Sequence, residues 1–399
     1  IGTMNVLFLT ISYPNVYDDQ NMYTDLTQEF RRQGHKVRVA TLLEAREGGR
    51  THLNTERGIE VLRVRSGNFF KVSPIEKGLT MMRLSRDFMN AILEYFSSDS
   101  IDLVIYPTPP ITFGPVVKRL KRHFGCITYL ILRDIFPQNA YDLELMRNPV
   151  LFGYFRRMER ALYDLSDHIG CMSEGNIKYV ETHNAVDNGK LHILYNWKRE
   201  EITDFGCPAT VIDSEPVTAV FGGNLGMAQE LDFLMDLIRL YRSRTDVRFL
   251  LVGDGTERER LEDTIQEEWL DNVELLRRIP RSEYGKVLLD SDIGIVTLDR
   301  RFTIPNFPSK TLSYFEAGLP VVAATDQHTD FGQFLSDIGA GLWSITGDLE
   351  SFHNNFERLV SDSVLRREMG SRGRQFFVDN LTVETAYQTI TDKVEALKQ

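Results

Sequence analysis

Short apolar runs alternate with amphipathic stretches along most of the chain, and this alternation restricts the fold more than any other feature. In the first half, helical patterns over Glu76–Phe96 and Pro149–Leu165 separate some of these runs. The runs read NVLFLTIS from Asn5, KVRVATLL from Lys36, IDLVIYP from Ile101, CITYLIL from Cys126, HIGCM from His168 and LHILY from Leu191. Strands and helices in such short cycles predict a parallel sheet that helices cover on both faces.

The alternation lapses once, over DFGCPATVIDSEP from Asp204 to Pro216, and then begins again. The second half contains the runs VTAVFGG, VRFLLVGDG, VELL, DIGIVTL and PVVAA, and it ends in three helical patterns. We therefore predict an α/β chain with two doubly wound, Rossmann-like domains, over residues 4–202 and 217–380. We expect a linker over 203–216 and a last helix over 381–399 that packs back toward the first domain. Such sheets bind ligands at the carboxyl ends of their strands, so the domains are expected to face a central cleft.

Charge limits the kinds of partner. The net charge of -11, from 46 Lys and Arg against 57 Asp and Glu, argues against general nucleic-acid binding. Residues 1–200 carry 26 basic and 23 acidic residues, a net of +3, which leaves 20 and 34, a net of -14, for residues 201–399. This asymmetry indicates two domains with different partners.

The sequence shows no signal peptide and no run of 18 apolar residues, which argues against secretion and against a membrane span. Three cysteines without metal-like spacing fit a reduced compartment. We expect a cytoplasmic protein, with the inner face of the cell membrane as an alternative location. The histidines are scattered, and the one DxD match, Asp290–Asp292, precedes an apolar run, so no metal and no cofactor is expected.

The stretch FGGNLGMAQELD places three glycines directly after an apolar run. In a strand-to-helix turn, Gly222, Gly223 and Gly226 would let backbone N–H groups approach a phosphate closely. A tight turn that needs positive φ explains any one of them equally well. The spacing is not GxGxxG, so no dinucleotide fingerprint is predicted. A second turn, the DG pair of LVGDGTERERLE, by itself favours a structural role.

The stretch NFPSKTLSYFEAGLPVV places Lys310 in the first turn of a predicted helix, directly after Pro308 and Ser309. The positive end of a helix dipole repels a cation, so this position indicates that an anion lies nearby. Ser309 and the helix N–H groups could bind phosphate oxygens, and Lys310 could neutralise a diphosphate as it leaves. The alternative is a solvated lysine on a surface turn.

In the first half, YLILRDIFPQNAYD ends an apolar run with Arg133 and Asp134. This pair could orient a sugar hydroxyl or a diphosphate, and a structural ion pair explains it equally well. Three other stretches, over Phe69–Leu93, Lys118–Phe124 and Arg147–Leu165, mix basic with apolar residues. They could rest on an anionic membrane surface, whereas ordinary packing on a sheet explains most of their apolar positions.

Together these stretches resemble the family-4 retaining glycosyltransferases of the GT-B fold, over essentially the whole chain. The nearest branch is that of bacterial enzymes of O-antigen, capsule and related cell-surface polysaccharides. The resemblance is carried by FGGNLGMAQELD, FLLVGDGTERERLE, NFPSKTLSYFEAGLPVVAA, RDIFPQNA and ILYNW, in this order and spacing.

The resemblance implies that the C-terminal domain binds a nucleotide-sugar donor, most often a UDP-sugar, and that the N-terminal domain binds the acceptor. Lys310 matches the diphosphate contact of the family. The other implied donor-side residues are Gly222, Gly223, Asn224 and Gln229 in the donor loop, Asp254 and Gly255 in the turn near the nucleotide, Arg278 and Ile279 where the backbone meets the base, and Ser309 and Ser313. Retaining transfer in this family needs no metal, because the departing diphosphate takes the acceptor proton on the same face.

The sequence departs from the family at several positions. Asn224 and Gln229 stand where many members have arginine and lysine, so Lys310, with Arg133 as a candidate second charge, would neutralise the diphosphate. The paired glutamates of the family are replaced by Pro305 and Ser313, with Glu316 one helical turn after Ser313.

On the acceptor side, Arg133 stands where many relatives carry a histidine. Asp134 is then the candidate for a catalytic or acceptor-orienting residue, beside Arg133 and Lys310.

The resulting expectation is a retaining hexosyl- or N-acetylhexosaminyl-transferase that acts on a lipid-linked glycan in cell-surface polysaccharide synthesis. One alternative is a nucleotide-sugar epimerase of GT-B architecture, for which the sequence offers few acid/base residues. Another is a non-catalytic donor-binding subunit, which the missing glutamates would explain.

Overall fold

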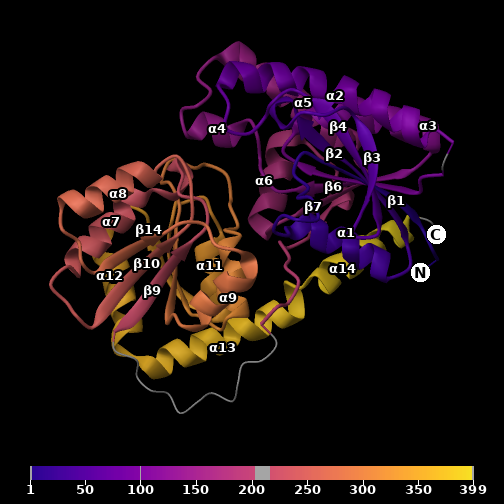
Figure 1. Cartoon of the computed structure of the whole chain (residues 1–399). Coiled ribbons are helices and arrows are strands. Elements are labelled where there is room, and N and C mark those ends of the chain that lie inside the picture. Colours follow the sequence, from indigo (N-terminus) through magenta and orange to yellow (C-terminus); the bar gives the residue numbers. More distant parts are fainter. Residues whose placement is uncertain (1, 99, 203–215, 398–399) are drawn as a thin grey trace. The chain divides into compact units, whose positions relative to one another are not determined.

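A mostly parallel β-sheet lies at the centre of each of two units in the computed structural model, which describes residues 2–98, 100–202 and 216–397 (Figure 1). Unit 1 contains residues 2–195 and 383–397, and unit 2 contains the described part of 196–382. The two Rossmann-like α/β domains expected from the sequence are therefore confirmed. The expected linker over 203–216 lies outside the described residues, except for Pro216.

Unit 1 contains an eight-stranded sheet in the order β3-β4-β2-β1-β5-β6-β7-β8, parallel except for β3 against β4. The strands are β1 Asn5–Thr10, β2 Lys36–Glu44, β3 His52–Glu56, β4 Ile59–Ser66, β5 Leu103–Thr108, β6 Ile127–Leu132, β7 His168–Cys171 and β8 Leu191–Ile193. The sequence analysis missed β3 and β4. They form a hairpin whose two turn residues, Arg57 and Gly58, both have positive φ, at 51° and 76°.

Several helices of unit 1 begin with a side-chain cap. Asn21 forms a capping box with Thr24 at the start of α1, and Ser73 and Asn148 cap α2 and α5. The helices are α1 Met22–Arg32, α2 Pro74–Phe96, α3 Gly114–Phe124, α4 Gln138–Asp142, α5 Pro149–Leu165, α6 Glu174–Asn184 and α14 Val383–Ala396, with short 3-10 turns η1 Ala45–Glu47, η2 Ile111–Phe113 and η3 Asn188–Lys190.

Unit 2 contains a six-stranded, fully parallel sheet in the order β11-β10-β9-β12-β13-β14. The strands are β9 Val217–Gly222, β10 Val247–Val252, β11 Val273–Leu276, β12 Ile293–Thr297, β13 Val321–Thr325 and β14 Gly341–Ile345. The chain runs outward from β9 to β11 and then returns to β12 on the other side of β9. The topological switch point, where ligands of such sheets bind, therefore lies at the carboxyl ends of β9 and β12.

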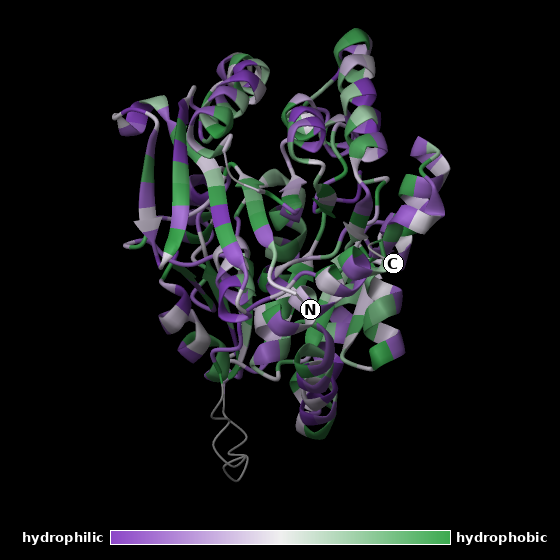
Figure 2. Cartoon of the chain, turned by 90° about the vertical axis from the view of Figure 1, so that its right-hand side faces the viewer, coloured by the Kyte–Doolittle hydropathy of each residue, from purple (hydrophilic) through white to green (hydrophobic). Residues whose placement is uncertain are grey.

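The helices of unit 2 cover both faces of this sheet. They are α7 Leu231–Leu240, α8 Arg258–Glu267, α9 Arg281–Leu289, α10 Lys310–Glu316, α11 Phe331–Ile338, α12 Leu349–Ser361 and α13 Ser363–Asn380, with the turn η4 Met227–Gln229. On one face, Phe233 of α7 stacks on Phe352 of α12, and Phe249 of β10 stacks on Phe356 of α12. Figure 2 shows hydrophobic residues concentrated along the strands, while the helices alternate between hydrophobic and hydrophilic residues.

Two segments near the domain boundary, residues 196–202 and α14, are each held in their unit by contacts with residues far away in the chain. The sequence pattern assigns residues 196–202 to the first domain, whereas they pack within unit 2, where Glu316 accepts the N–H groups of Glu201 and Ile202 at 2.6 and 3.1 Å. The last helix, α14, belongs to unit 1, where the Tyr387 hydroxyl and Nε2 of His35 are 2.8 Å apart. Both attachments are long-range contacts.

Among the described helices, none is long and apolar enough to cross a membrane.

Candidate functional site

Lys310 is the first residue of α10 and reaches the turn that follows β9. Its Nζ lies 3.8 Å from the centroid of the Phe221 ring and donates a hydrogen bond to Oε1 of Gln229. A Cβ added to Gly223 would lie 3.7 Å from Cε of Lys310. The structure therefore brings together three of the residues that the sequence analysis selected for the donor side.

The environment of Lys310 weakens its charge. Its side chain is partly buried over the Phe221 ring, and this loss of water lowers the pKa of Lys310 to about 7. Near neutral pH the group is therefore close to half protonated when no ligand is bound. An anion placed beside the ammonium group would stabilise the charged form, so this position favours binding of a phosphate or diphosphate.

The two adjacent glycines of the turn are required by close packing. A Cβ on Gly222 would lie 1.8 Å from the hydroxyl oxygen of Tyr284, and Gly223 has a φ of +113°. The N–H of Gly222 donates to the Tyr314 hydroxyl at 3.0 Å, and the N–H of Gly223 donates to the Val252 carbonyl at 2.9 Å. Both N–H groups are thus used within the protein. Of the two explanations that the sequence left open, the structure favours turn geometry for these glycines.

The remaining donor-loop residue, Asn224, packs against two further glycines. Its side chain lies where a Cβ on Gly226 or on Gly255 would collide with it. The backbone N–H of Asn224 makes no hydrogen bond with the part of the chain that the structure describes. This N–H group is therefore free to donate to a ligand. Asn224 follows Gly223, which lies close to Lys310.

Asp254 and Gly255 tie neighbouring turns together at this edge of the sheet. The Asp254 carbonyl accepts the N–H of Leu225 at 2.9 Å, and its carboxylate accepts the N–H of Arg278 at 3.2 Å. A Cβ on Gly255 would lie 2.3 Å from the Leu225 carbonyl oxygen. These contacts give Asp254 and Gly255 a structural role. The Arg278 side chain is exposed and Ile279 beside it is partly buried.

Ser309 and Ser313 are more exposed than Glu316, which is buried. Ser309 is exposed and its hydroxyl makes no capping hydrogen bond, while Ser313 is partly buried one turn later. Glu316 is 1 % exposed, forms an ion pair with Lys198 and accepts two backbone N–H groups of residues 201–202. Its carboxylate is therefore committed to holding residues 198–202 and does not replace the missing glutamates.

Arg133 and Asp134 lie in unit 1, directly after β6. The N–H of Arg133 donates to the Thr108 hydroxyl at 3.2 Å, and its guanidinium group contacts the sulfur of Met22. Within the described residues Arg133 and Asp134 form no ion pair at contact distance, but the charge of Arg133 acts on the Asp134 carboxyl, so the structural alternative stays open. Burial raises the pKa of the Asp134 carboxyl, and the nearby charges of Arg133 and Lys77 partly offset this rise.

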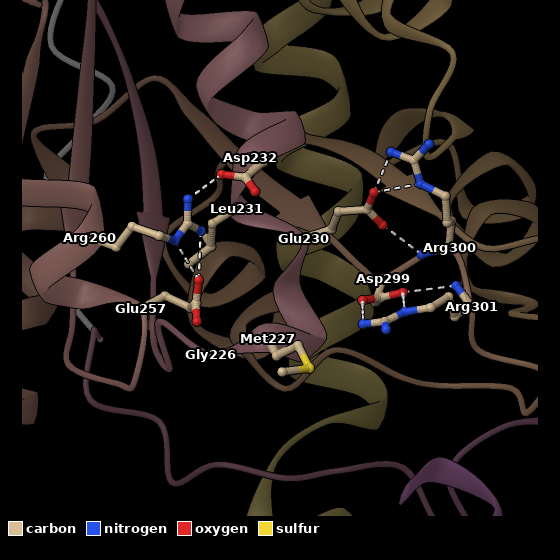
Figure 3. Close-up of a pocket in the computed structure, with 10 residues that line it drawn as sticks. All are labelled: Gly226, Met227, Glu230, Leu231, Asp232, Glu257, Arg260, Asp299, Arg300 and Arg301. Carbon is tan, nitrogen blue, oxygen red and sulfur yellow. Dashed lines mark hydrogen bonds and ion pairs between the residues drawn. The ribbon is translucent and has the colours of Figure 1, made fainter. Parts of the chain in front are cut away.

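A pocket of about 390 Å³ opens beside the turn after β9, close to the switch point of the sheet (Figure 3). Sequence reasoning missed it, because its residues come from three separate turns. Its charged side chains are paired: Arg260 with Asp232 and Glu257, Arg300 with Glu230, and Arg301 with Asp299. The only sign in the sequence is the run Asp299–Arg301, which reads as an ordinary polar loop. This pocket is large enough for a small ligand, but its four carboxylates and three arginines do not select an anion.

The described residues contain no cluster of three or more His, Cys, Asp or Glu side chains that could hold a metal ion.

Two family models match the chain. Residues 20–197 match Glycosyltransferase Family 4, and residues 208–376 match Glycosyl transferases group 1. No curated protein matches the sequence.

Solved structures with the same fold cover nearly the whole chain. Sucrose-phosphate synthase (tll1590) from Thermosynechococcus elongatus is 15 % identical with a TM-score of 0.77, and the match covers 99 % of both chains. Alr3699/HepE from Anabaena, in complex with UDP-glucose, is 16 % identical with a TM-score of 0.68, and the match covers 98 % of this chain and 100 % of that one. WaaG, a glycosyltransferase involved in lipopolysaccharide biosynthesis, is 13 % identical with a TM-score of 0.66, covering 98 % and 99 %.

Proposed function

Because the chain is a glycosyltransferase of the GT-B type, built from a Family 4 domain and a group 1 domain, we propose that it moves a sugar from a nucleotide-diphosphate donor to a glycan acceptor. A UDP-sugar is the favoured donor. HepE, a structural neighbour, has been solved with UDP and with UDP-glucose, which supports this choice. The proposed acceptor is a lipid-linked glycan of a cell-surface polysaccharide, and the involvement of the structural neighbour WaaG in lipopolysaccharide biosynthesis supports that role.

The observation that carries the proposal is the position of Lys310. Its ammonium group is partly buried over Phe221, bonded to Gln229 and adjacent to Gly223, at the carboxyl end of β9. In the proposed complex the donor diphosphate lies against this group, where its charge restores full protonation of the lysine. The Ser309 hydroxyl and the Asn224 N–H are the further donors available to its oxygens.

In the proposed reaction, the bond between the anomeric carbon and the diphosphate oxygen breaks, and its electron pair leaves with the diphosphate. The acceptor hydroxyl forms the new bond on the same face, so the configuration is retained. Its proton passes to the departing diphosphate oxygen. Lys310 stabilises the negative charge that develops on the leaving group, and no metal is needed.

The other proposed contacts follow from their positions. Ser313 binds a ribose hydroxyl, and the backbone at Arg278 and Ile279 meets the base. In unit 1, the carboxylate of Asp134 orients the acceptor hydroxyl, with the charge of Arg133 close to it.

The lipid-linked acceptor is supported by exposed apolar side chains in unit 1. Around α4 and α5 these are Tyr141, Leu145, Val150, Leu151 and Tyr154, and Arg147 lies among them. Exposed apolar residues close together in the chain fit contact with the apolar part of a bilayer. We therefore propose a cytoplasmic enzyme that works at the inner face of the membrane.

Thermal unfolding with UDP, GDP, ADP and CMP tests the donor site. At a hundredfold excess over the dissociation constant, a ligand adds about 2.7 kcal/mol, which raises the midpoint by several degrees. We expect a shift with UDP and none with Lys310→Ala. No shift with any nucleotide would refute the donor site, and donor consumption without an acceptor would point to an epimerase instead.

A further inference from the structure

A second pocket, of about 500 Å³, lies in unit 1 and is lined by four arginines. Arg50 comes from the loop before β3, Arg65 from the end of β4, and Arg83 and Arg86 from α2. Asp87 is the one carboxylate among the lining residues. In a chain with a net charge of -11, such a concentration of positive charge needs a physical reason.

The arginines of this pocket mostly lack carboxylate partners, in contrast to the arginines of the pocket in Figure 3. There each arginine binds a carboxylate. Within the described part of the chain, the guanidinium groups of Arg50 and Arg83 form no hydrogen bond and no ion pair. The Arg86 Nε lies 3.7 Å from Asp87, and the Arg86 side chain is 70 % exposed, so this pair is weak.

The single carboxylate is already engaged, and one arginine is held in place. The other oxygen of Asp87 accepts a hydrogen bond from the Ser66 hydroxyl at 2.7 Å. A guanidinium nitrogen of Arg65 donates to the carbonyl of Gly49, which fixes that side chain at the rim of the pocket. Four like charges around one hollow repel each other, and a bound anion would remove that repulsion.

We propose that this pocket binds a phosphate or diphosphate group. Arginine presents a planar set of N–H donors that matches phosphate oxygens, so several arginines around one concavity select this chemistry. The lining residues belong to unit 1, whereas Lys310 belongs to unit 2. The phosphate site does not depend on sugar transfer, and only the lipid source of the phosphate rests on the proposed function.

The residues beside the arginines on α2 favour a lipid as that source. Leu79 and Met82 are 52 % and 72 % exposed. Leu79 is four residues before Arg83, and Met82 is four residues before Arg86, so the apolar and basic side chains share one face of the helix. An amphipathic ligand would place its phosphate on the arginines and its apolar part on Leu79 and Met82.

The test compares two matched double variants of the full-length protein. R83Q/R86Q removes two charges from the pocket, and R119Q/R122Q removes two exposed charges from α3, outside it. Within the described residues the side chains of neither pair bond to the backbone, and glutamine is a good helix former. We expect R83Q/R86Q to weaken binding of inorganic pyrophosphate in calorimetry about tenfold or more, with R119Q/R122Q unchanged. Lys310→Ala removes any pyrophosphate binding at the proposed nucleotide site. Binding at the arginine pocket can then be measured alone, so the two proposals are tested independently.

Equal pyrophosphate binding by wild type and R83Q/R86Q, with native circular dichroism, would overturn the proposal. Flotation with phosphatidylcholine vesicles that contain phosphatidic acid identifies the source of the phosphate. If L79S/M82S keeps pyrophosphate binding but loses flotation, the phosphate site stands and belongs to a lipid. If L79S/M82S floats like wild type while R83Q/R86Q still loses pyrophosphate, the site stands and takes a soluble phosphorylated ligand.

Discussion

Lys310 donates a hydrogen bond to Gln229, 81 residues earlier in the chain, and so links the start of α10 to the turn after β9. The same ammonium group lies over the Phe221 ring. An uncompensated lysine in this position costs stability in the ligand-free protein and becomes favourable only when an anion arrives. The buried lysine therefore lowers the stability of the free protein and raises its affinity for an anion.

Lys310→Met is expected to stabilise the ligand-free protein while abolishing UDP binding. The pKa of Lys310 is lowered to about 7, so the unfolded chain binds more protons than the folded one between about pH 7 and the ordinary lysine value. Stability therefore rises with pH across that window, and the cost is greatest below it. Scanning calorimetry should show a midpoint a few degrees higher for Lys310→Met at neutral pH, and a smaller difference in alkaline buffer. A lower midpoint would contradict this account.

UDP binding should weaken as the pH rises above about 7. The diphosphate binds the protonated lysine, whose pKa in the free protein is about 7, so the dissociation constant should increase about tenfold per pH unit until the pKa of the complex is reached. Calorimetry between about pH 7 and pH 9 measures this slope. Lys310→Arg stays charged throughout, and any binding that it retains should be nearly independent of pH. Parallel slopes for the two proteins would exclude Lys310 as the titrating group.

Gly222→Ala should destabilise unit 2 by about 1–3 kcal/mol, because its Cβ would collide with the Tyr284 hydroxyl. Tyr284→Phe removes the closest atom, so the double variant should recover part of the loss. Urea unfolding of the four proteins in this cycle gives the coupling. Strict additivity would mean that the close approach of Gly222 to Tyr284 does not set the cost.

Glu316→Gln should lower stability by about 3 kcal/mol and leave the affinity for UDP unchanged, because the carboxylate serves Lys198 and the backbone of residues 201–202. Ser313→Ala is the matched change one turn earlier, and it should do the reverse, with little effect on stability and weaker UDP binding. Denaturation and calorimetry on both variants measure the two quantities. A loss of UDP affinity in a folded Glu316→Gln protein would restore this glutamate as a ligand contact.

Local pattern determined much of this protein. Most strands of both sheets, the three C-terminal helices and the turn at Gly222 and Gly223 follow from apolar runs, helical periodicity and glycine placement, which act between near neighbours. A lysine in the first turn of a helix is unusual, and this position alone identifies Lys310 as a candidate ligand contact.

Only the tertiary structure shows which polar groups already have hydrogen-bond partners within the protein and which are available to a ligand. Glu316 looks available in the sequence, but residues 115 positions away occupy its carboxylate. The N–H groups of Gly222 and Gly223 are taken by Tyr314 and Val252. The arginine pocket also combines separate segments, namely the loop before β3, the end of β4 and α2. These properties depend on contacts between residues far apart in the chain, and no pattern of neighbouring residues encodes which partner each polar group meets in the fold.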